Sequence, residues 1–526
     1  MEFGAHESLV LLALLASGAA LLALAQVVRI PYPILLVLGG LALGFLPGMP
    51  EIELPPDLVL VAFLPPLLYG AAFFTPLREF RTNVVEISLH AVGLVLMTMV
   101  GVAVAAHAVI PGLTWPAAFV LGAIVSPTDP TAATAIAQRL GLPRRLVSVI
   151  EGESLVNDGT ALVAYRVAVV AVVSGSFSLA GASGRFVLNV AGGILVGLAV
   201  GFVIREVRRR LDNPPVEITI SILSGYFAYL PAHALHVSGV LAAVTVGIYM
   251  GWHTPELTTF QTRLQGQAVW EIVFLVLNAL LFALVGLQLP AIVDSLADRP
   301  TGDLLTYAAL VTGIVVAVRF AWVLVAAQTP INVMRMEGSP PWKGAVVVAW
   351  AGMRGAVSLA AALALPLTTD AGAPFPDRDL IVFLTFCVIL GTLVVQGLTL
   401  PALIRWLDLE DDGLAEKEET KARIRAAEAA LDRLEELVDE DWVNEDTAER
   451  LRGLYGFRRD RFRSRFDAES DGAIETQSVN YQRLRRELLE AERQAVRQLR
   501  RDGYIDDDVL RRVTRDLDLD DARLDI

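Results

Sequence analysis

Residues 123–136 read AIVSPTDPTAATAI, an apolar helical pattern interrupted by a polar segment with two prolines. Pro127 and Pro130 each remove a backbone donor and clash with the preceding turn, so a helix through this stretch is expected to break around them. Irregular backbone inside a membrane is tolerated only where it lines a cavity. Thr128, Asp129 and the carbonyls released by the break then form an oxygen-rich candidate site for a hard cation. A proline kink with a capping Asp is the alternative interpretation.

The composition is that of a membrane domain followed by a charged extension. The 526 residues are 54% hydrophobic, with a mean hydropathy of +0.55, which is high for a soluble domain. Residues 1–410 hold 25 acidic and 20 basic residues, whereas the much shorter region 411–526 holds 32 and 23. We therefore predict an all-α polytopic membrane domain over residues 1–410 and a charged tail over 411–526.

Apolar runs long enough to cross a hydrocarbon core of roughly 30 Å occur thirteen times in the first region. They lie at about 8–27, 32–47, 57–75, 84–110, 115–138, 146–174, 186–204, 216–234, 238–251, 268–290, 304–328, 343–367 and 380–404. A different division of 216–251 would fit the pattern as well. The sequence predicts thirteen transmembrane helices.

The loops between these runs alternate in charge. Those near residues 139–145 and 205–210 are rich in arginine, while the loops of the opposite set hold almost none, with Arg299 as the exception. The positive-inside rule predicts an N-terminus outside and a cytoplasmic tail, which an odd number of crossings also requires. Residues 1–7 have no positive region, so the first run is predicted to be a membrane segment and not a signal peptide.

Residues 149–165, VIEGESLVNDGTALVAY, place three carboxylates in an apolar segment. Ionisable residues inside a membrane are costly and each needs a partner or a function. Glu151, Ser154 and Asp158 share one helix face by their spacing. We expect Ser154 and Asp158 to point toward the break in the preceding segment.

A second stripe on the same helix consists of Glu153 and Asn157. Arg319, the lone charge in a later apolar run, is the natural partner of Glu153, because an ion pair removes an unpaired charge on both sides. That pairing would leave Asp158 and Asp129 as the titratable carboxylates.

The run at 343–367 contains a second candidate break. Gly352 and Gly355 flank Arg354, so this helix is expected to loosen at its centre. With the seventh segment as a linker, the remaining segments form two inverted six-helix repeats in which the two broken helices correspond and cross. Paired interrupted segments of this kind indicate the binding site of a transporter. Arg354 could offset the helix-dipole ends at the crossing or take part in gating.

Four long motifs in this order resemble a known family. They are FLPPLLYGAAF (63–73), SPTDPTAATAI (126–136), EGESLVNDGTALVAY (151–165) and GMRGAVSLA (352–360). They are similar to the signature segments of the monovalent cation:proton antiporter-1 family, the NhaP-type sodium/proton antiporters. The resemblance spans residues 8–405 and leaves the tail uncovered. It implies a thirteen-helix fold with a dimerisation domain and a mobile core domain, working as a homodimer.

The resemblance also implies roles for individual residues. Asp158 corresponds to the carboxylate that binds the cation and the proton. The residues that complete or support this site are Asp129, Thr128, Ser154, Glu153, Asn157, Arg319 and Arg354. An Asn–Asp pair at 157–158, where relatives have Asp–Asp, goes with electroneutral exchange in this family.

The expected activity is exchange of sodium for protons across the cell membrane, for pH and sodium homeostasis, with lithium or potassium as alternative cations. A poorly solvated carboxylate binds either a proton or a cation, and only the neutralised site should cross the barrier, which gives alternating-access exchange without ATP. No nucleotide-binding loop is evident. We expect no enzyme activity, no cofactor and no nucleic-acid partner, and membrane lipid as the surroundings.

Two other classes remain as alternatives. An intramembrane aspartyl protease also needs two aspartates, but its GxGD sequence is replaced here by VND. A cation channel would not couple cation flux to protons. The single cysteine, Cys387, excludes an internal disulfide framework, and the six histidines show no metal-binding spacing.

The tail has a helical pattern. Residues 414–438, 480–502 and 506–517 carry apolar residues at helical spacing and many charge pairs four residues apart. An amphipathic helical subdomain is predicted, either regulatory or simply a solvated extension.

Overall fold

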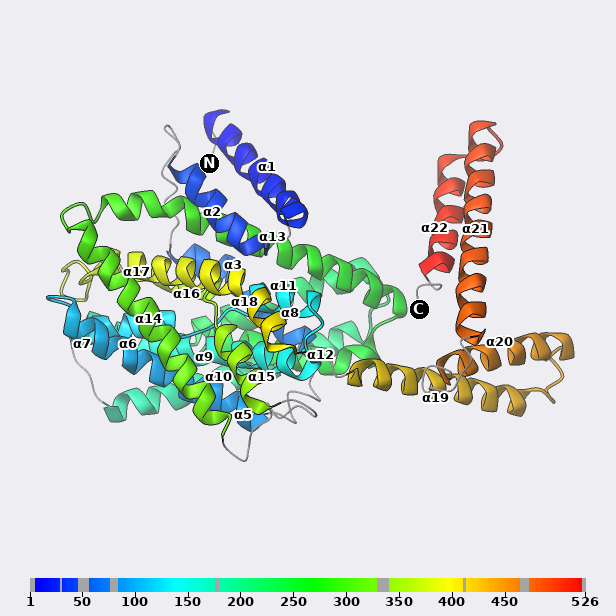
Figure 1. The fold of residues 1–526 in the computed structure, drawn as a ribbon, viewed down its shortest axis with the longest axis horizontal. Helices are drawn as coiled ribbons and strands as arrows, with labels where there is room; N and C mark the ends of the chain where they lie inside the picture. The colour runs from blue at the N-terminus through cyan, green and yellow to red at the C-terminus, as the bar shows by residue number, and fades with distance from the viewer. Residues whose placement is uncertain are drawn as a thin grey trace. The chain divides into compact units, whose positions relative to one another are not determined.

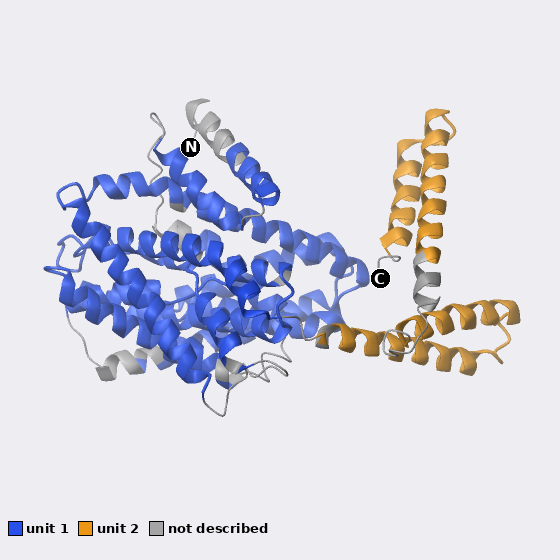
Figure 2. Ribbon diagram, viewed as in Figure 1, with its two compact units in different colours: residues 1–411 blue, residues 412–526 orange. Residues whose placement is uncertain are grey.

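The structure is a computed structural model that describes residues 5–28, 31–45, 56–75, 84–175, 179–328, 340–409, 413–463 and 473–522. The chain divides into two compact units, residues 1–411 and 412–526 (Figure 2). The boundary predicted after residue 410 lies outside the described residues. In the described part the regular structure is helical, apart from one isolated bridge between Thr368 and Pro374.

The first unit is a bundle of apolar helices (Figure 1). They are α1 (Ala5–Val28), α2 (Tyr32–Gly44), α3 (Pro56–Phe74), α5 (Val84–Ser88), the π-helix η1 (Leu89–Leu94), α6 (Val95–Val109), α7 (Trp115–Val125), α8 (Thr131–Arg139), α9 (Arg144–Ser174), α10 (Leu179–Arg208), α11 (Pro214–Ala234), α12 (Gly239–Leu257), α13 (Phe260–Asp294), α14 (Thr301–Ala326), α15 (Pro341–Trp350), α16 (Ala356–Leu363), α17 (Arg378–Gly391), the π-helix η2 (Thr392–Gln396) and α18 (Gly397–Leu407).

These helices coincide with the apolar runs of the sequence. Each run corresponds to one helix or to consecutive helices, although the last two residues of the run 32–47 lie outside the described residues. Within the described part, six helical stretches are long and apolar enough to cross a membrane. The number of crossings and the inverted repeats stay predictions.

Side-chain caps explain where several helices begin. The side chains of Thr114, Asn213, Ser238 and Thr259 accept hydrogen bonds from backbone N–H groups in the first turns of α7, α11, α12 and α13. Such caps satisfy donors that the helix itself leaves unpaired. The loops between the apolar runs therefore also specify the helix boundaries.

Two helices are interrupted where the sequence predicts it. The chain is irregular between α7 and α8, around Pro127 and Pro130, and again between α15 and α16, around Arg354. The two irregular segments touch, because the backbone N–H of Asp129 donates to the carbonyl of Met353 at 2.8 Å. The breaks therefore form one structural feature.

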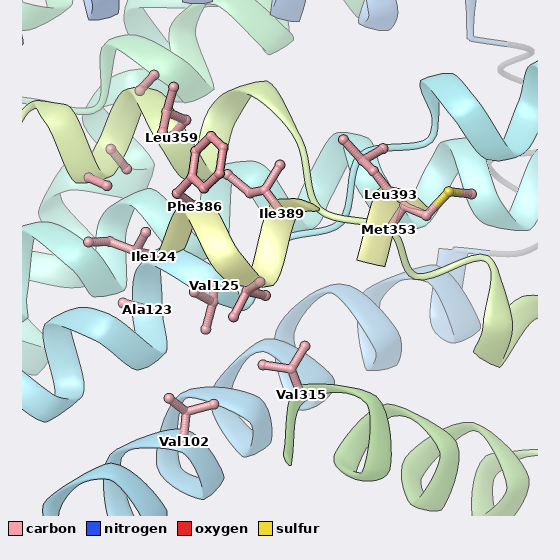
Figure 3. Packing of buried hydrophobic residues seen from close by; sticks show 14 of the residues in the cluster. Val102, Ala123, Ile124, Val125, Val315, Met353, Leu359, Phe386, Ile389 and Leu393 are labelled. Carbon is pink, nitrogen blue, oxygen red and sulfur yellow. The ribbon is translucent and has the colours of Figure 1, made fainter. Parts of the chain in front are cut away.

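The hydrophobic core of the first unit surrounds this crossing. Buried side chains from α6, α7, α14, α16 and α17 belong to one cluster, represented by Val102, Val125, Val315, Leu359 and Phe386 (Figure 3). Burial of this apolar surface holds the irregular segments in place despite their missing helical hydrogen bonds.

A close helix contact supports one wall of the site described below. At Gly40 of α2 a Cβ atom would meet the carbonyl of Ala283, and at Gly286 of α13 it would meet backbone atoms of α2. The two backbones approach closely only because both positions lack a side chain, as in other small-residue contacts between membrane helices.

The described residues of the second unit form four helices. They are α19 (Leu414–Leu437), α20 (Glu445–Arg463), α21 (Ala473–Arg501) and α22 (Asp507–Ala522). Ion pairs such as Arg463–Glu428 at 3.1 Å and Arg493–Asp518 at 2.9 Å connect α20 to α19 and α21 to α22. Helix α20 falls between the stretches predicted as helical, because few apolar residues mark its buried side.

Candidate functional site

A cavity of about 540 Å³ lies where the α7–α8 break meets α9. Its lining comes from that break and from α2, α3, α8, α9, α13 and α16. The residues predicted to form the cation site all line it, namely Thr128, Asp129, Ser154 and Asp158. Glu151 lines it as well, on the helix face expected from its spacing. Thr128 and Asp129 thus meet residues 25–30 positions later in the sequence at one cavity.

Two side chains of α9 hold Thr128 in its irregular conformation. The Ser154 hydroxyl donates to the Thr128 carbonyl at 2.6 Å, and the Asn157 amide donates to the Thr128 hydroxyl at 2.8 Å. Because the Ser154 hydrogen is engaged, the lone pairs of its oxygen remain available as a ligand. Asn157 therefore positions a site residue and contributes no charge.

Asp158 is the unpaired carboxylate of this group. Only 9% of its surface is exposed, and it makes no hydrogen bond or ion pair with another described residue. A buried carboxylate is expensive unless something neutralises it. A bound proton or cation in the cavity would do so.

Glu153 faces away from the cavity and pairs with Arg319 of α14. Both side chains are 1% exposed, and they form a two-point pair with N···O distances of 2.5 and 3.1 Å. The structure thus contains the ion pair predicted from the sequence. Arg319 also donates to the carbonyls of Val348 and Ala349 near the end of α15, at 2.9 and 3.2 Å. One guanidinium therefore neutralises an acid and satisfies the end of a broken helix.

The side chain of Asp129 contacts both irregular segments of the crossing. Its carboxylate accepts the N–H of Thr131 at 2.8 Å, which caps the start of α8. A Cβ atom at Gly355 would collide with the Asp129 carboxylate, so this group also lies against the start of α16. The capping role considered from the sequence is present, and it coexists with a place in the cavity wall. A negative charge at two helix starts is favourable.

Arg354 is fully buried at the second break. Its Nε donates to the carbonyl of Val125 at the end of α7 at 3.1 Å, and its Nη1 donates to the carbonyl of Gly352. Its backbone N–H donates to the Thr392 hydroxyl of η2 at 3.1 Å. Arg354 thus donates to carbonyls at the crossing, as expected of a residue that offsets the helix-dipole ends there. It does not line the cavity.

Residues that the sequence interpretation did not select also line the cavity. Among them are Tyr32 of α2, Asn278 of α13 and Ser358 of α16. Ser358 is 2% exposed, and its hydroxyl has no hydrogen-bond partner in the described part of the chain. Asn278 could have been found as the lone amide of the apolar stretch LVLNALLF. Ser358 and Tyr32 gave no comparable signal.

The chemistry of this cavity suits a hard, weakly held cation. Carboxylates, hydroxyls and carbonyls provide oxygen ligands, which alkali metal ions prefer over nitrogen or sulfur. Within the described ranges no group of three or more His, Cys, Asp or Glu side chains could hold a metal ion. The cavity therefore offers oxygen ligands to an alkali cation, among them the carboxylates of Asp129, Glu151 and Asp158.

Comparison with known proteins agrees with this geometry. The family profile described as "Sodium/hydrogen exchanger, transmembrane" matches residues 10–406. The chain belongs to the sodium/hydrogen exchanger family. It is therefore an integral membrane protein of a transporter family and not of an enzyme class, which argues against the protease interpretation.

Individual members of the sodium/hydrogen exchanger family resemble most of the chain. An uncharacterized Na(+)/H(+) exchanger of Mycobacterium tuberculosis is 39% identical over 504 residues, covering 94% of this chain and 92% of that protein. The "Sodium, potassium, lithium and rubidium/H(+) antiporter" of Bacillus pumilus is 35% identical over 448 residues, covering 82% of this chain and 66% of that protein.

A solved structure shares the fold. The sodium proton antiporter MjNhaP1 from Methanocaldococcus jannaschii matches with a TM-score of 0.59 at 19% identity, covering 76% of this chain and 98% of that one. The helical arrangement of this exchanger is thus that of an NhaP antiporter.

Proposed function

We propose that this protein is a secondary active transporter that exchanges sodium for protons across the cell membrane, with lithium or potassium as alternative cations. Membership of the exchanger family supports the reaction class. The name of the Bacillus pumilus relative includes four alkali cations, which supports a broad choice of cation. Such an activity would serve pH and sodium homeostasis.

The observation that carries this proposal is the contrast between two acids on α9. Glu153 is neutralised by Arg319, whereas Asp158, five residues on, faces the cavity without a partner among the described residues. Asp158 is therefore our candidate for the exchanging carboxylate. Ser154, Thr128 and Asp129 would supply further oxygen ligands.

Exchange would follow from competition at Asp158. The carboxylate binds a proton or a cation, and in both cases the charge in the cavity is largely neutralised. An empty anion in the membrane interior is expensive, so only the occupied site would change its access from one side to the other. This rule couples the two fluxes in opposite directions.

The proposed stoichiometry is one cation for one proton. Asn157 cannot titrate, and Glu153 is held by Arg319. Asp129 caps α8 and contributes to the cation site. With Asp158 as the single exchanging group, the cycle would move no net charge.

The proposed architecture has thirteen membrane crossings in two inverted six-helix repeats, linked by the seventh segment. The N-terminus would lie outside and residues 411–526 in the cytoplasm, as the arginine-rich loops suggest. We also propose a homodimer with a mobile core domain, by analogy with the NhaP antiporters that the sequence motifs resemble.

Reconstitution into liposomes tests the proposal. Sodium added outside vesicles with a preset pH gradient should collapse the gradient, read with a pH-sensitive dye. The variant Asp158→Asn should show no response, whereas Cys387→Ala, at a position with no proposed role, should respond like the wild type. Sodium uptake without proton movement would indicate a channel. Absence of any response to sodium, lithium and potassium would refute the proposal.

A further inference from the structure

A second, smaller cavity of about 210 Å³ lies among helix ends in the first unit. It is lined by residues from the ends of α3, α10 and α12 and from the starts of α11 and α13. Long apolar helices stop near the lipid headgroups, so we expect this cavity at the depth of the membrane interface. Phe74 lines both this cavity and the site described above.

Arg208, the last residue of α10, is the unusual feature of this cavity. Its surface is only 2% exposed, and its Nε and Nη1 atoms have no hydrogen-bond partner in the described part of the chain. The nearest acid is Glu217, with 3.6 Å between Nη2 and Oε2, which is too long for a good hydrogen bond. A buried guanidinium with unused donors is costly, and an acceptor that reached these donors from the cavity would lower that cost.

The other polar groups of the cavity restrict the kind of ligand. Arg263 brings a second guanidinium, which donates to the Thr258 carbonyl at 2.6 Å. The hydroxyls of Thr254 and Thr258 donate to carbonyls of α12, at 2.7 and 2.9 Å. The two arginines are the charged donors of the cavity, beside the neutral amide of Gln267 and hydroxyl of Ser221. Of the described residues that line the cavity, none is acidic.

The local charge balance favours an anion. Glu217 is 1% exposed and accepts a hydrogen bond from Thr262 at 3.3 Å, and it offsets the charge of Arg208 only in part. Arg263 adds a second positive charge at the same cavity. A ligand with negative charge would balance this excess.

We propose that this cavity binds a phosphate group, either on an anionic lipid headgroup or as inorganic phosphate. The planar guanidinium fork matches two phosphate oxygens. The volume is far above the roughly 10–15 Å³ needed for one water molecule. A bound phosphate would connect the α10–α11 loop to the α12–α13 loop. The inference does not depend on transport by the other site.

Thermal unfolding of the full chain tests this site with two probes. In phosphatidylcholine nanodiscs, inorganic phosphate is titrated against chloride at constant ionic strength, and in a parallel series phosphatidylglycerol replaces part of the lipid. A ligand that binds the folded state raises the unfolding midpoint with its concentration. A response to inorganic phosphate identifies the free ion, and a response to phosphatidylglycerol alone identifies the lipid headgroup. No response in either series would refute the proposal.

Variants then connect the response to the cavity. Arg208→Gln should weaken the apparent affinity at least about tenfold, the loss expected for charged hydrogen bonds. Arg263→Gln, at an exposed position, is the second variant if Arg208→Gln does not fold, and it should also weaken binding. The matched control is Arg209→Gln, which is exposed, paired with Glu206 and absent from the cavity. An equal loss of affinity in Arg209→Gln would mean that the probe responds only to the positive charge of the surface. That result would refute the site.

Discussion

Removing Glu153 should destabilise the protein far more than removing a surface acid. In Glu153→Ala the Arg319 guanidinium stays fully buried without its carboxylate, and breaking such a pair costs about 3–5 kcal/mol. Arg319 keeps its bonds to the Val348 and Ala349 carbonyls, so the cost should lie near the lower end. Arg319→Met should cost more, because it strands Glu153 and also leaves those carbonyls unsatisfied.

The double variant Glu153→Leu, Arg319→Met separates the ion pair from the helix-end contacts. With both charges gone, only the two carbonyls lose their donors, at about 1–3 kcal/mol for each unsatisfied group. It should therefore be more stable than Arg319→Met alone. The midpoint of thermal unfolding, read from the fluorescence of the 8 tryptophans, provides the ranking. Glu206→Ala, which breaks exposed pairs, is the control and should change stability by less than about 1 kcal/mol. If Glu153→Ala unfolds like the wild type, or if the two single effects simply add in the double variant, the reasoning about this pair is wrong.

Three further predictions concern transport. Asp158→Asn should abolish sodium-driven proton flux in liposomes while keeping the wild-type unfolding midpoint. Residual coupled flux would mean that a residue other than Asp158 is the exchanging group. Gly355→Ala should reduce the flux because its Cβ would meet the Asp129 carboxylate. Gly313→Ala, in open space on α14, should leave the flux unchanged. Equal fluxes in the two variants would contradict the close contact between Gly355 and Asp129. In vesicles clamped at different voltages, the wild-type equilibrium sodium gradient should not shift, since each uncompensated charge would couple about 2.3 kcal/mol per 100 mV. A shift in the wild type would mean a second proton carrier, and Asn157→Asp is the variant expected to create one.

Much of the fold was predictable because its causes are local. The apolar runs predicted the positions of the helices, and Pro127 and Pro130 predicted the break between α7 and α8. The pair of Glu153 with Arg319 followed from the cost of two lone charges in apolar segments, without any knowledge of distance. Features of this kind depend on residue type and spacing alone.

The rest depends on how distant helices pack. Nothing local indicates that Arg354 reaches the Val125 carbonyl, or that Tyr32 lines the same cavity as Asp158. The π-helical turns η1 and η2 were missed for the same reason, since their sequences are ordinary apolar helix. Helix α20 was missed because its pattern of apolar residues is weak.

The long sequence separations at the crossing have a consequence for biosynthesis. Arg319, the partner of Glu153, is synthesised 166 residues after it. Arg354, which donates to the Val125 carbonyl, is synthesised 229 residues after Val125. At translation rates of about 5–20 residues per second, the second interval lasts roughly 10–45 s. Over the shorter interval Glu153 is in the nascent chain without its counter-ion, and over the longer one α7 lacks the donor for its last turn. The first half of the nascent chain is thus unable to close the crossing by itself, and the cavity is assembled only as the final helices are inserted.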